Sequence, residues 1–439
     1  MKTALIFLMA GVDLQGTSAM RFNRAGSWDV LRVQRWYSQR GWFVGVNFIP
    51  SSAVNQLEMW QAATFDEHTI DRELGFAANI GISVVRVFLH DMAYIADPPG
   101  FLGRVDRFLS LADKHGISAM LVFFDGCWSP RAQLGTQPAP LEKVHNSRWL
   151  QSPTQGMLGD PAQWRQLETY VKAVVGRFHQ DARVHSWDLY NEADQKALEK
   201  TISQRLPVSF SQEHHIQLRL LLLQYSFAWV RSSMPQQPLT ACEWDDGHGF
   251  GMEPRFRELI RSNVDFGSFH IYGTAEQTRL VIDQMRKAYP QRPLMLTEYM
   301  ARCVGSTINE ILPLAHNQGV AAISWGLVQG KTNTIWPWWS WTYNMAEQEP
   351  NPWFHDLLRP NGDAYSPQET LLIRKLVLMA RAAPTYEKYT SSAILFNVDG
   401  VKRVHSVNAS SFAQCSPAEE KYLQFIREPT GHASAEKSA

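Results

Sequence analysis

Residues 184–192 read VHSWDLYNE, a largely apolar stretch that ends in the polar pair Asn191-Glu192. Residues 294–299 read LMLTEY and repeat this arrangement, with Glu298 following four apolar or small residues. Short runs of this kind are typical of strands that are buried on both faces of a parallel sheet. The two stretches therefore predict buried strands that each present a glutamate at the carboxyl end.

Similar runs recur from Trp42 to about Met379, where they alternate with segments of helical periodicity. This alternation is the pattern of a parallel sheet covered by helices. Eight runs fit a strand, and that number favours a closed (β/α)8 TIM barrel, an α/β fold, over an open sheet. The eight runs are Trp42–Phe48, Ser83–Leu89, Ser118–Phe124, Val184–Tyr190, Leu239–Glu243, Phe266–Ile271, Leu294–Thr297 and Ala321–Trp325.

The predicted helices carry local start and stop signals. Asp160-Pro161 and Ser366-Pro367 each supply an N-cap residue followed by a first-turn proline. Gly81, Gly116 and Gly319 stand where a helix must end before the next strand. These signals support the same succession of elements as the apolar runs do.

The amino-terminal residues are predicted to be an extension that contains a candidate signal segment. Lys2, the apolar run Ala4–Val12 and the small residues Thr17-Ser18-Ala19 loosely fit a short secretory signal. A tail of poorly ordered residues, or a translation start at Met20, is the alternative. Secretion or a periplasmic location is therefore slightly favoured over the cytoplasm.

Three regions follow from this organisation. Residues 1–40 form the N-terminal extension, residues 41–383 the catalytic barrel, and residues 384–439 a C-terminal extension or disordered tail. The tail is assigned on composition, because its helical and strand periodicity fades into small and charged residues.

Composition excludes partners that bind through charge. Lys plus Arg and Asp plus Glu both number 42, so the net charge is zero and no basic field attracts nucleic acid or a membrane surface. The 16 tryptophans are many for 439 residues, and indole rings outside the core are suited to stacking on the apolar faces of sugars. Neither feature predicts an oligomeric state.

Polar residues at the strand ends form the candidate site, because barrel enzymes place their chemistry at the carboxyl ends of the strands. Glu192 and Glu298 end the fourth and seventh strands, which face each other across the barrel mouth. Glycoside hydrolysis requires such a carboxyl pair, with one as acid and base and the other as nucleophile or water-activating base. The site needs neither a cofactor nor a metal for that chemistry.

The two glutamate stretches resemble a known group of enzymes. Trp187–Glu192 resembles the Asn-Glu signature that ends the fourth strand of clan A glycoside hydrolases, especially the cellulase-like family 5. Leu294–Tyr299 is similar to the seventh strand of that group, and the resemblance covers roughly Trp42 to Met379. It implies that Glu192 is the acid/base, that Glu298 is the nucleophile and that the anomeric configuration is retained on a β-linked carbohydrate substrate.

The resemblance also implies roles for residues around the pair. Arg86 and Tyr272 are expected to stabilise the Glu298 carboxylate, and Asn191 to bond the sugar 2-hydroxyl. Glu192 must carry a proton near neutral pH, which a partly desolvated position beside an ionised Glu298 favours. The full set of predicted substrate-binding residues is Arg86, His90, Trp128, Asn191, His270, Tyr272 and Trp325.

Val46–Pro50 and Glu298–Arg302 extend the resemblance to bacterial proteins labelled β-1,4-xylanase-like, a label that does not fix a substrate. Two positions depart from the family 5 pattern. Asp125 stands where many members have histidine, and Ala193 replaces the proline that usually follows the catalytic glutamate. His90 is the candidate to fill the place of the missing histidine.

Other readings of the same residues stay open. Trp336, Trp338, Trp339 and Trp341 crowd the loop after the eighth strand and are candidates either for sugar subsites or for loop packing. Asp245, Asp246 and His248 fit no strong ligand spacing, which favours a solvated loop over a metal site. The alternative functions are a non-catalytic carbohydrate-binding barrel and a metal-assisted barrel hydrolase.

Overall fold

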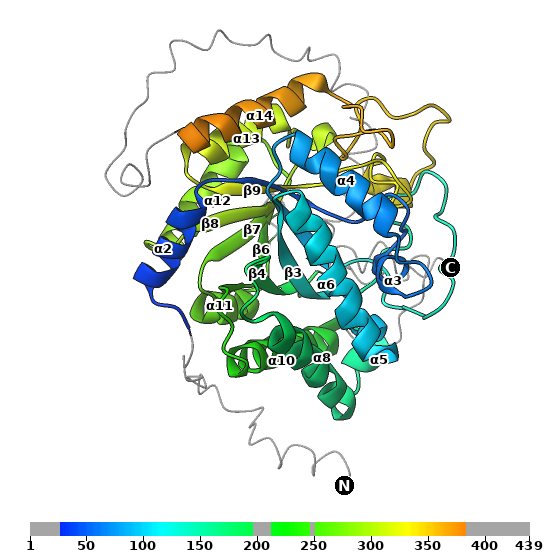
Figure 1. Cartoon of the computed structure of the whole chain (residues 1–439), viewed down its shortest axis with the longest axis vertical. Helices are drawn as coiled ribbons and strands as arrows, with labels where there is room; N and C mark the ends of the chain where they lie inside the picture. The colour runs from blue at the N-terminus through cyan, green and yellow to red at the C-terminus, as the bar shows by residue number, and fades with distance from the viewer. Residues whose placement is uncertain (1–26, 196–211, 246–250, 383–439) are drawn as a thin grey trace, which may run out of the picture.

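The structure is a computed structural model that describes residues 27–195, 212–245 and 251–382. In these residues a parallel sheet curls through the centre of the molecule and helices surround it (Figure 1). Its strands are β1 (Val44–Asn47), β2 (Val84–Phe88), β3 (Ser118–Asp125), β4 (Val184–Asn191), β5 (Leu239–Thr240), β6 (Glu243–Asp245), β7 (Gly267–Ile271), β8 (Leu294–Glu298) and β9 (Ala321–Trp325).

The short strands β5 and β6 are two pieces of one interrupted strand. The hydrogen-bonded order is β5-β4-β3-β2-β1-β9-β8-β7-β6, so β5 and β6 occupy the two ends of the sheet. Only Ala241 and Cys242 separate them in the chain, so the sheet closes on itself through the backbone. The predicted (β/α)8 barrel is confirmed, and its fifth run, Leu239–Glu243, contains the interruption.

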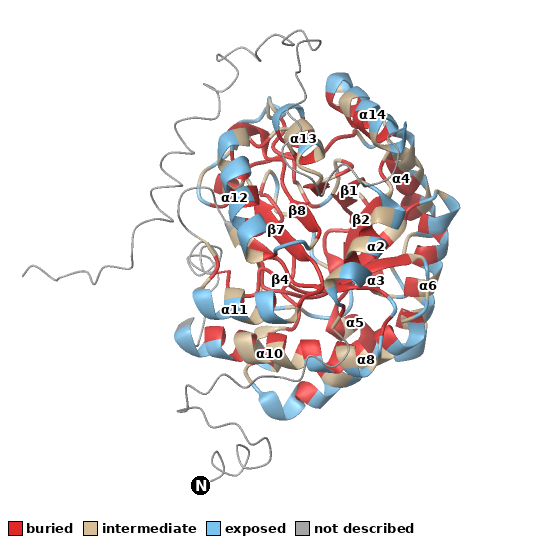
Figure 2. Ribbon diagram, turned by 90° about the vertical axis from the view of Figure 1, so that its left-hand side faces the viewer, coloured by how far each residue is buried: buried red, intermediate tan, exposed pale blue. Residues whose placement is uncertain are grey.

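The helices turn their buried faces toward the barrel and their exposed faces outward (Figure 2). α8 shows the pattern, because Leu167, Val171, Val174 and Phe178 recur at helical spacing and are all fully buried. The α-helices are α2 (Val30–Arg40), α3 (Gln56–Trp60), α4 (Glu67–Asn79), α5 (Asp91–Ala96), α6 (Pro98–Lys114), α7 (Gln155–Leu158), α8 (Trp164–Phe178), α10 (Gln212–Ser232), α11 (Pro254–Asn263), α12 (Ala275–Ala288), α13 (Ile308–Asn317) and α14 (Pro367–Ala382). The described ranges also contain the 3-10 turns η1 (Pro161–Gln163), η2 (Arg302–Val304) and η3 (Trp338–Trp341).

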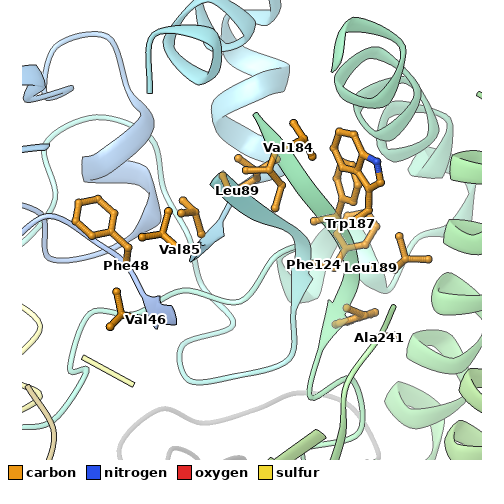
Figure 3. Close-up of a cluster of buried hydrophobic side chains, with 14 of the residues drawn as sticks. Val46, Phe48, Val85, Leu89, Phe124, Val184, Trp187, Leu189 and Ala241 are labelled. Carbon is orange, nitrogen blue, oxygen red and sulfur yellow. The ribbon is translucent and has the colours of Figure 1, made fainter. Parts of the chain in front are cut away.

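The strands send alternate side chains into the barrel and into the layer beneath the helices. In β2, Val85 and Val87 belong to the main core, whereas Val84 belongs to a second cluster inside the barrel. Figure 3 shows Val85 within the main core beside side chains of neighbouring strands. Arg86 is in step with Val84, and the two-residue period of a strand therefore directs this cation into the barrel interior.

The second cluster closes the amino-terminal end of the barrel. Trp36 of α2 stacks on Phe266 with ring centroids 5.7 Å apart, and it packs with Val33 against the first residues of the strands. Residues 27–40 are thus attached to the barrel, although the sequence assigns them to an extension. The domain limits themselves stay a prediction, because the candidate signal segment and residues 384–439 lie outside the described residues.

None of the helices in the described ranges is both long and apolar enough to cross a bilayer.

Candidate active site

Glu192 and Glu298 meet at the carboxyl end of the barrel. Glu298 is the last residue of β8, and Glu192 directly follows β4 with a backbone φ of +42°. A positive φ is uncommon outside glycine and marks a strained position of the kind found at functional sites. One oxygen from each glutamate and one ring nitrogen of His270 all lie within 4.8 Å of one another.

Glu298 is bound by a cation and by a phenol. Arg86 Nη1 donates to Oε1 at 2.7 Å, and the Tyr272 hydroxyl donates to Oε2 at 2.8 Å. Burial raises the pKa of Glu298, while His270 and Arg86 act in the opposite direction. The direct ion pair with Arg86 stabilises the carboxylate form, which is the form that a nucleophile requires.

Arg86 is fully buried, and each of its five N–H groups has an acceptor. Nε and Nη2 donate to the same oxygen of Asp188, and the remaining donors reach Asn47, Glu298 and the amide oxygen of Asn191 at 2.7–2.9 Å. Burial alone lowers the pKa of Arg86, but Asp188 and Glu298 outweigh it and raise that pKa. Arg86 is therefore a fixed positive charge bonded directly to Glu298.

Glu192 receives hydrogen bonds from neutral groups. His270 Nδ1 lies 2.8 Å from Oε1, whereas Gln195 Nε2 and Cys127 Sγ lie 2.7 Å and 3.2 Å from Oε2. Burial raises the pKa of Glu192, and the bonds from Gln195 and Cys127 partly oppose that rise. Because no Lys or Arg in the described part of the chain is paired with this carboxyl, a proton shared by the pair is better placed on Glu192 than on Glu298.

His270 lies between the two carboxyl groups. Its Nδ1 is 2.8 Å from Glu192 and 3.6 Å from Glu298, and burial lowers its pKa to about 4. The ring is therefore neutral near pH 7. An Nδ1–H tautomer fits this position, because the nearest acceptor is a carboxyl oxygen.

Asp125 and Asn191 extend the network toward the third strand. The Asn191 amide nitrogen donates to Asp125 Oδ1 at 3.0 Å, and Trp149 Nε1 donates to Oδ2 at 2.7 Å. Burial raises the pKa of Asp125 to about 6. Asp125 thus holds Asn191 beside Glu192.

The predicted aromatic residues Trp128 and Trp325 pack against other aromatic rings. Trp325 packs edge-on against Phe88 and Trp149, and its side chain is 8% exposed. Trp128 stacks on Trp341 with ring centroids 5.3 Å apart and an interplanar angle of 14°. These rings belong to one buried apolar cluster with Cys127, the thiol that contacts Glu192. Their contact with sugar stays a prediction.

The tryptophan-rich loop after β9 is mostly packed. Trp336, Trp339 and Trp341 are buried, whereas Trp338 is half-buried and packs edge-on against Tyr272 at 5.0 Å between centroids. Trp338 therefore contacts Tyr272, whose hydroxyl is bonded to Glu298.

His90 lies apart from these residues. It precedes α5, where its Nδ1 accepts a hydrogen bond from the Met92 backbone at 3.2 Å, and its side chain is 0% exposed. No described hydrogen bond joins His90 to either glutamate. Arg86, His270 and Tyr272 each bond to one of the glutamates, and Asn191 bonds to Arg86 and Asp125, whereas the role of His90 in substrate binding stays a prediction without a contact to support it.

Several site residues were not assigned a role from the sequence. Asn47 and Asp188 are polar residues within buried strand runs, and that pattern is a usable signal for an interior network. Gln195 and Cys127 lie on loops, where no periodicity fixes the direction of a side chain. Trp149, which holds Asp125, gave no signal beyond its residue type.

Among the described residues, the group of side chains that lie close enough together to hold a metal ion is Glu192, His270 and Glu298. Glu298 already accepts from Arg86 and Tyr272, so a cation there would compete with a fixed guanidinium. Of the three residues considered for a metal site in the sequence, Asp246 and His248 lie outside the described residues.

Gly126 allows the third and fourth strands to approach each other at the site. Its backbone N–H donates to Asn191 O at 2.9 Å, and a Cβ at this position would lie 2.4 Å from the carbonyl oxygen of Glu192. That oxygen belongs to the backbone and cannot move aside without shifting Glu192.

Replacing Gly126 with alanine is therefore expected to lower kcat about 100-fold, because small displacements of a catalytic group have effects of that size. Steady-state kinetics on an aryl glycoside would measure the loss. Gly103→Ala is the matched control, because a Cβ there meets nothing within 4 Å. Equal kinetics for the two variants would contradict the expectation.

Solved structures that match this fold include glycoside hydrolases. A variant GH5_18 enzyme of Bifidobacterium longum subsp. longum, in complex with Manβ1-4GlcNAc, matches with a TM-score of 0.51 and 16% identity over 78% of this chain and 79% of that chain. The fold is that of these hydrolases. A β-glucosidase, 1317, matches with a TM-score of 0.52 and 12% identity, covering 76% of this chain and 98% of that chain. An exo-β-1,4-mannosidase from Opitutaceae bacterium strain TAV5 matches with a TM-score of 0.50 and 15% identity, covering 82% and 63%.

No protein-family model matches the sequence, and no curated protein matches it either. At identities this low, the structural likeness establishes the barrel architecture and leaves the chemistry to the residues of the site. It supports the family 5 type of fold that the sequence resembles. The xylanase-like label receives no support from the matches named above.

Proposed function

We propose that this protein is a retaining β-glycosidase that acts on a β-linked polysaccharide or oligosaccharide through a covalent glycosyl-enzyme intermediate. The observation that carries the proposal is the pair of buried carboxyl groups, with oxygens within 4.8 Å, of which only Glu298 is ion-paired to Arg86. A separation of roughly 5–5.5 Å is the spacing of retaining enzymes, whereas inverting enzymes need roughly 6.5–9.5 Å to admit water.

The proposed first step transfers the sugar to Glu298. Glu192 donates its proton to the glycosidic oxygen, which keeps the electron pair of the breaking bond to the anomeric carbon and leaves as a hydroxyl. A Glu298 oxygen forms the new bond to that carbon from the opposite face. Arg86 and Tyr272 hold Glu298 in place and ionised before the attack.

The second step releases the sugar. Glu192, now ionised, takes a proton from water as the water oxygen bonds to the anomeric carbon, and Glu298 departs as a carboxylate. His270, neutral and bound to Glu192, fixes the carboxyl in both steps without exchanging a net charge. Each glutamate thereby returns to its starting protonation state.

Two displacements at one carbon preserve its configuration, and this is the most direct test of the proposal. Proton NMR of a fresh digest is expected to show the substrate's own anomer first, before mutarotation mixes the pool. Initial release of the opposite anomer would mean that one glutamate activates water directly, and the covalent mechanism would be wrong.

The substrate is best sought with a panel of aryl β-glycosides and polysaccharides. Mannosides and glucosides come first, because neighbours of the same fold include an exo-β-1,4-mannosidase and a β-glucosidase. Xylosides and xylan follow, on the resemblance of residues 46–50 and 298–302. Binding of these sugars without turnover would instead favour the non-catalytic carbohydrate-binding barrel.

Chelation separates the glycosidase from a metal-assisted hydrolase. We expect release of reducing sugar to be unchanged after prolonged EDTA treatment, because Arg86 supplies the positive charge beside Glu298. The control is a zinc-dependent hydrolase inactivated under the same conditions. Loss of activity that zinc or another divalent cation restores would support the metal-assisted alternative and contradict the roles assigned above.

A further inference from the structure

Cys127 is a buried, reduced thiol in direct contact with the candidate acid/base. Its Sγ lies 3.2 Å from Oε2 of Glu192, on the segment that directly follows β3. Gly126 permits this approach, because the backbone of that segment bonds to Asn191 and leaves no space for a Cβ. The position of the thiol is thus fixed by the meeting of two strands.

The direction of the thiol hydrogen bond follows from its neighbours. Arg86 has only donors, so Asn191 Oδ1, 2.8 Å from Nη2, must accept. The Asn191 amide nitrogen therefore faces Asp125 at 3.0 Å and Cys127 Sγ at 3.5 Å as a donor. Because the sulfur lone pairs face Asn191, the thiol hydrogen points to Glu192.

The two oxygens of Glu192 consequently differ. Oε2 has two donors, Gln195 Nε2 at 2.7 Å and Cys127 Sγ, whereas Oε1 has His270 alone among the described residues. A carboxyl oxygen offers about two lone-pair directions, so two donors leave Oε2 without a site for a proton. Oε1, with one described donor, keeps a lone-pair direction at which a proton can bind.

We propose that Cys127 is a positioning residue for glycoside cleavage: its thiol helps to saturate Oε2 of Glu192 and so places the transferable proton on Oε1. This inference rests on the proposed function for its kinetic meaning, whereas the hydrogen bond itself can be tested without turnover. A thiol that donates to the ionised carboxyl also stabilises the ionised form. It therefore limits the rise that burial causes in the pKa of Glu192.

The pH dependence depends on all the groups that face Glu192. Activity requires a protonated Glu192, so it is lost as pH rises through the pKa of this acid. The ionisable groups facing Glu192 or its thiol neighbour are Arg86 of β2, Asp125 of β3, Asp194 after β4, Cys242 between β5 and β6, His270 of β7, Tyr272 after β7 and Glu298 of β8. Removing the Cys127 thiol takes one hydrogen-bond donor away from Glu192 and leaves the charge of these surrounding groups unchanged.

The test compares Cys127→Ala with Cys127→Ser. In Cys127→Ala, the basic limb of the kcat/KM profile is expected to move up by about half a pH unit, because a donor to the ionised form is lost. Substrates with poor leaving groups should lose more kcat than those with good ones, because they depend more on acid assistance. Cys127→Ser keeps a donor and should return the limb toward the wild-type position.

Ser226→Ala is the matched control, because it also removes one buried side-chain donor, a hydroxyl on α10 that donates to Leu222 O at 2.7 Å. The basic limb of the kcat/KM profile of this variant should stay at the wild-type position. An unmoved limb in Cys127→Ala, with equal losses across leaving groups, would reduce Cys127 to a packing residue and overturn the inference.

The S–H stretching band provides a readout that does not require activity. In the infrared difference between wild type and Cys127→Ala, the Cys127 band should move to lower frequency as Glu192 ionises with rising pH. A band that ignores pH overturns the hydrogen bond directly. A wild-type protein that cleaves no glycoside but shows the shift would disprove the proposed function and leave the thiol contact standing.

Discussion

Glu298→Ala is expected to lower turnover by at least about 10,000-fold, because removal of a catalytic nucleophile has effects of that order. Azide or formate should restore part of the activity on an aryl glycoside, since a small anion can occupy the space of the lost carboxylate and attack the anomeric carbon. The expected rescue product is a glycosyl azide of inverted configuration, which NMR or mass spectrometry identifies. The motivation is the position of Glu298 at the end of β8, bound to Arg86 and Tyr272.

A matched control distinguishes loss of chemistry from loss of structure. Glu243→Gln changes another buried glutamate of the barrel, one that is bound to Arg261 and Tyr289. It should reduce stability while keeping kcat within a few-fold of the wild type. Near-wild-type turnover in purified Glu298→Ala would end the assignment of the nucleophile, whatever the substrate proves to be.

Sequence periodicity was sufficient for the architecture and for the catalytic pair. The eight runs fell within two residues of the observed strands except at the fifth, which splits into β5 and β6. Nothing in the run Leu239–Glu243 marks that break, because Ala241 and Cys242 are as apolar as their neighbours. The break arises where the hydrogen-bonding partner changes, because β5 pairs with β4 and β6 pairs with β7. These partners are distant in sequence, so the run itself does not reveal them.

The direction of each side chain was predictable only within strands. The two-residue period sends Arg86 into the barrel, but the partners that use its five donors come from three other strands, β1, β4 and β8. His90 illustrates the opposite case. Two residues beyond a regular strand it becomes the residue that caps α5, a place where histidine is not among the preferred types.

Arg86→Met is expected to destabilise the protein by about 3–5 kcal/mol at pH 7, the range for removing one partner of a buried ion pair. The variant leaves Asp188 and Glu298 inside the barrel without their cation. Burial already raises the pKa of Glu298, and the loss of Arg86 removes one of the groups that oppose this rise. A carboxyl whose folded-state pKa lies above its unfolded value loses stability as pH rises. The deficit should therefore be largest above neutral pH and should shrink toward pH 5.

Urea denaturation of wild type and variant at several pH values measures this dependence. Arg107→Met is the control, because the Arg107–Glu67 pair, 2.6 Å apart, has side chains that are 51% and 48% exposed. Exposed pairs contribute about 0–1 kcal/mol, so this control should unfold close to the wild type at every pH. If Arg86→Met instead matched Arg107→Met, Arg86 could not be the fixed charge that holds Glu298 ionised. Among the described donors, the Tyr272 hydroxyl would then be the group left to stabilise the carboxylate of the nucleophile.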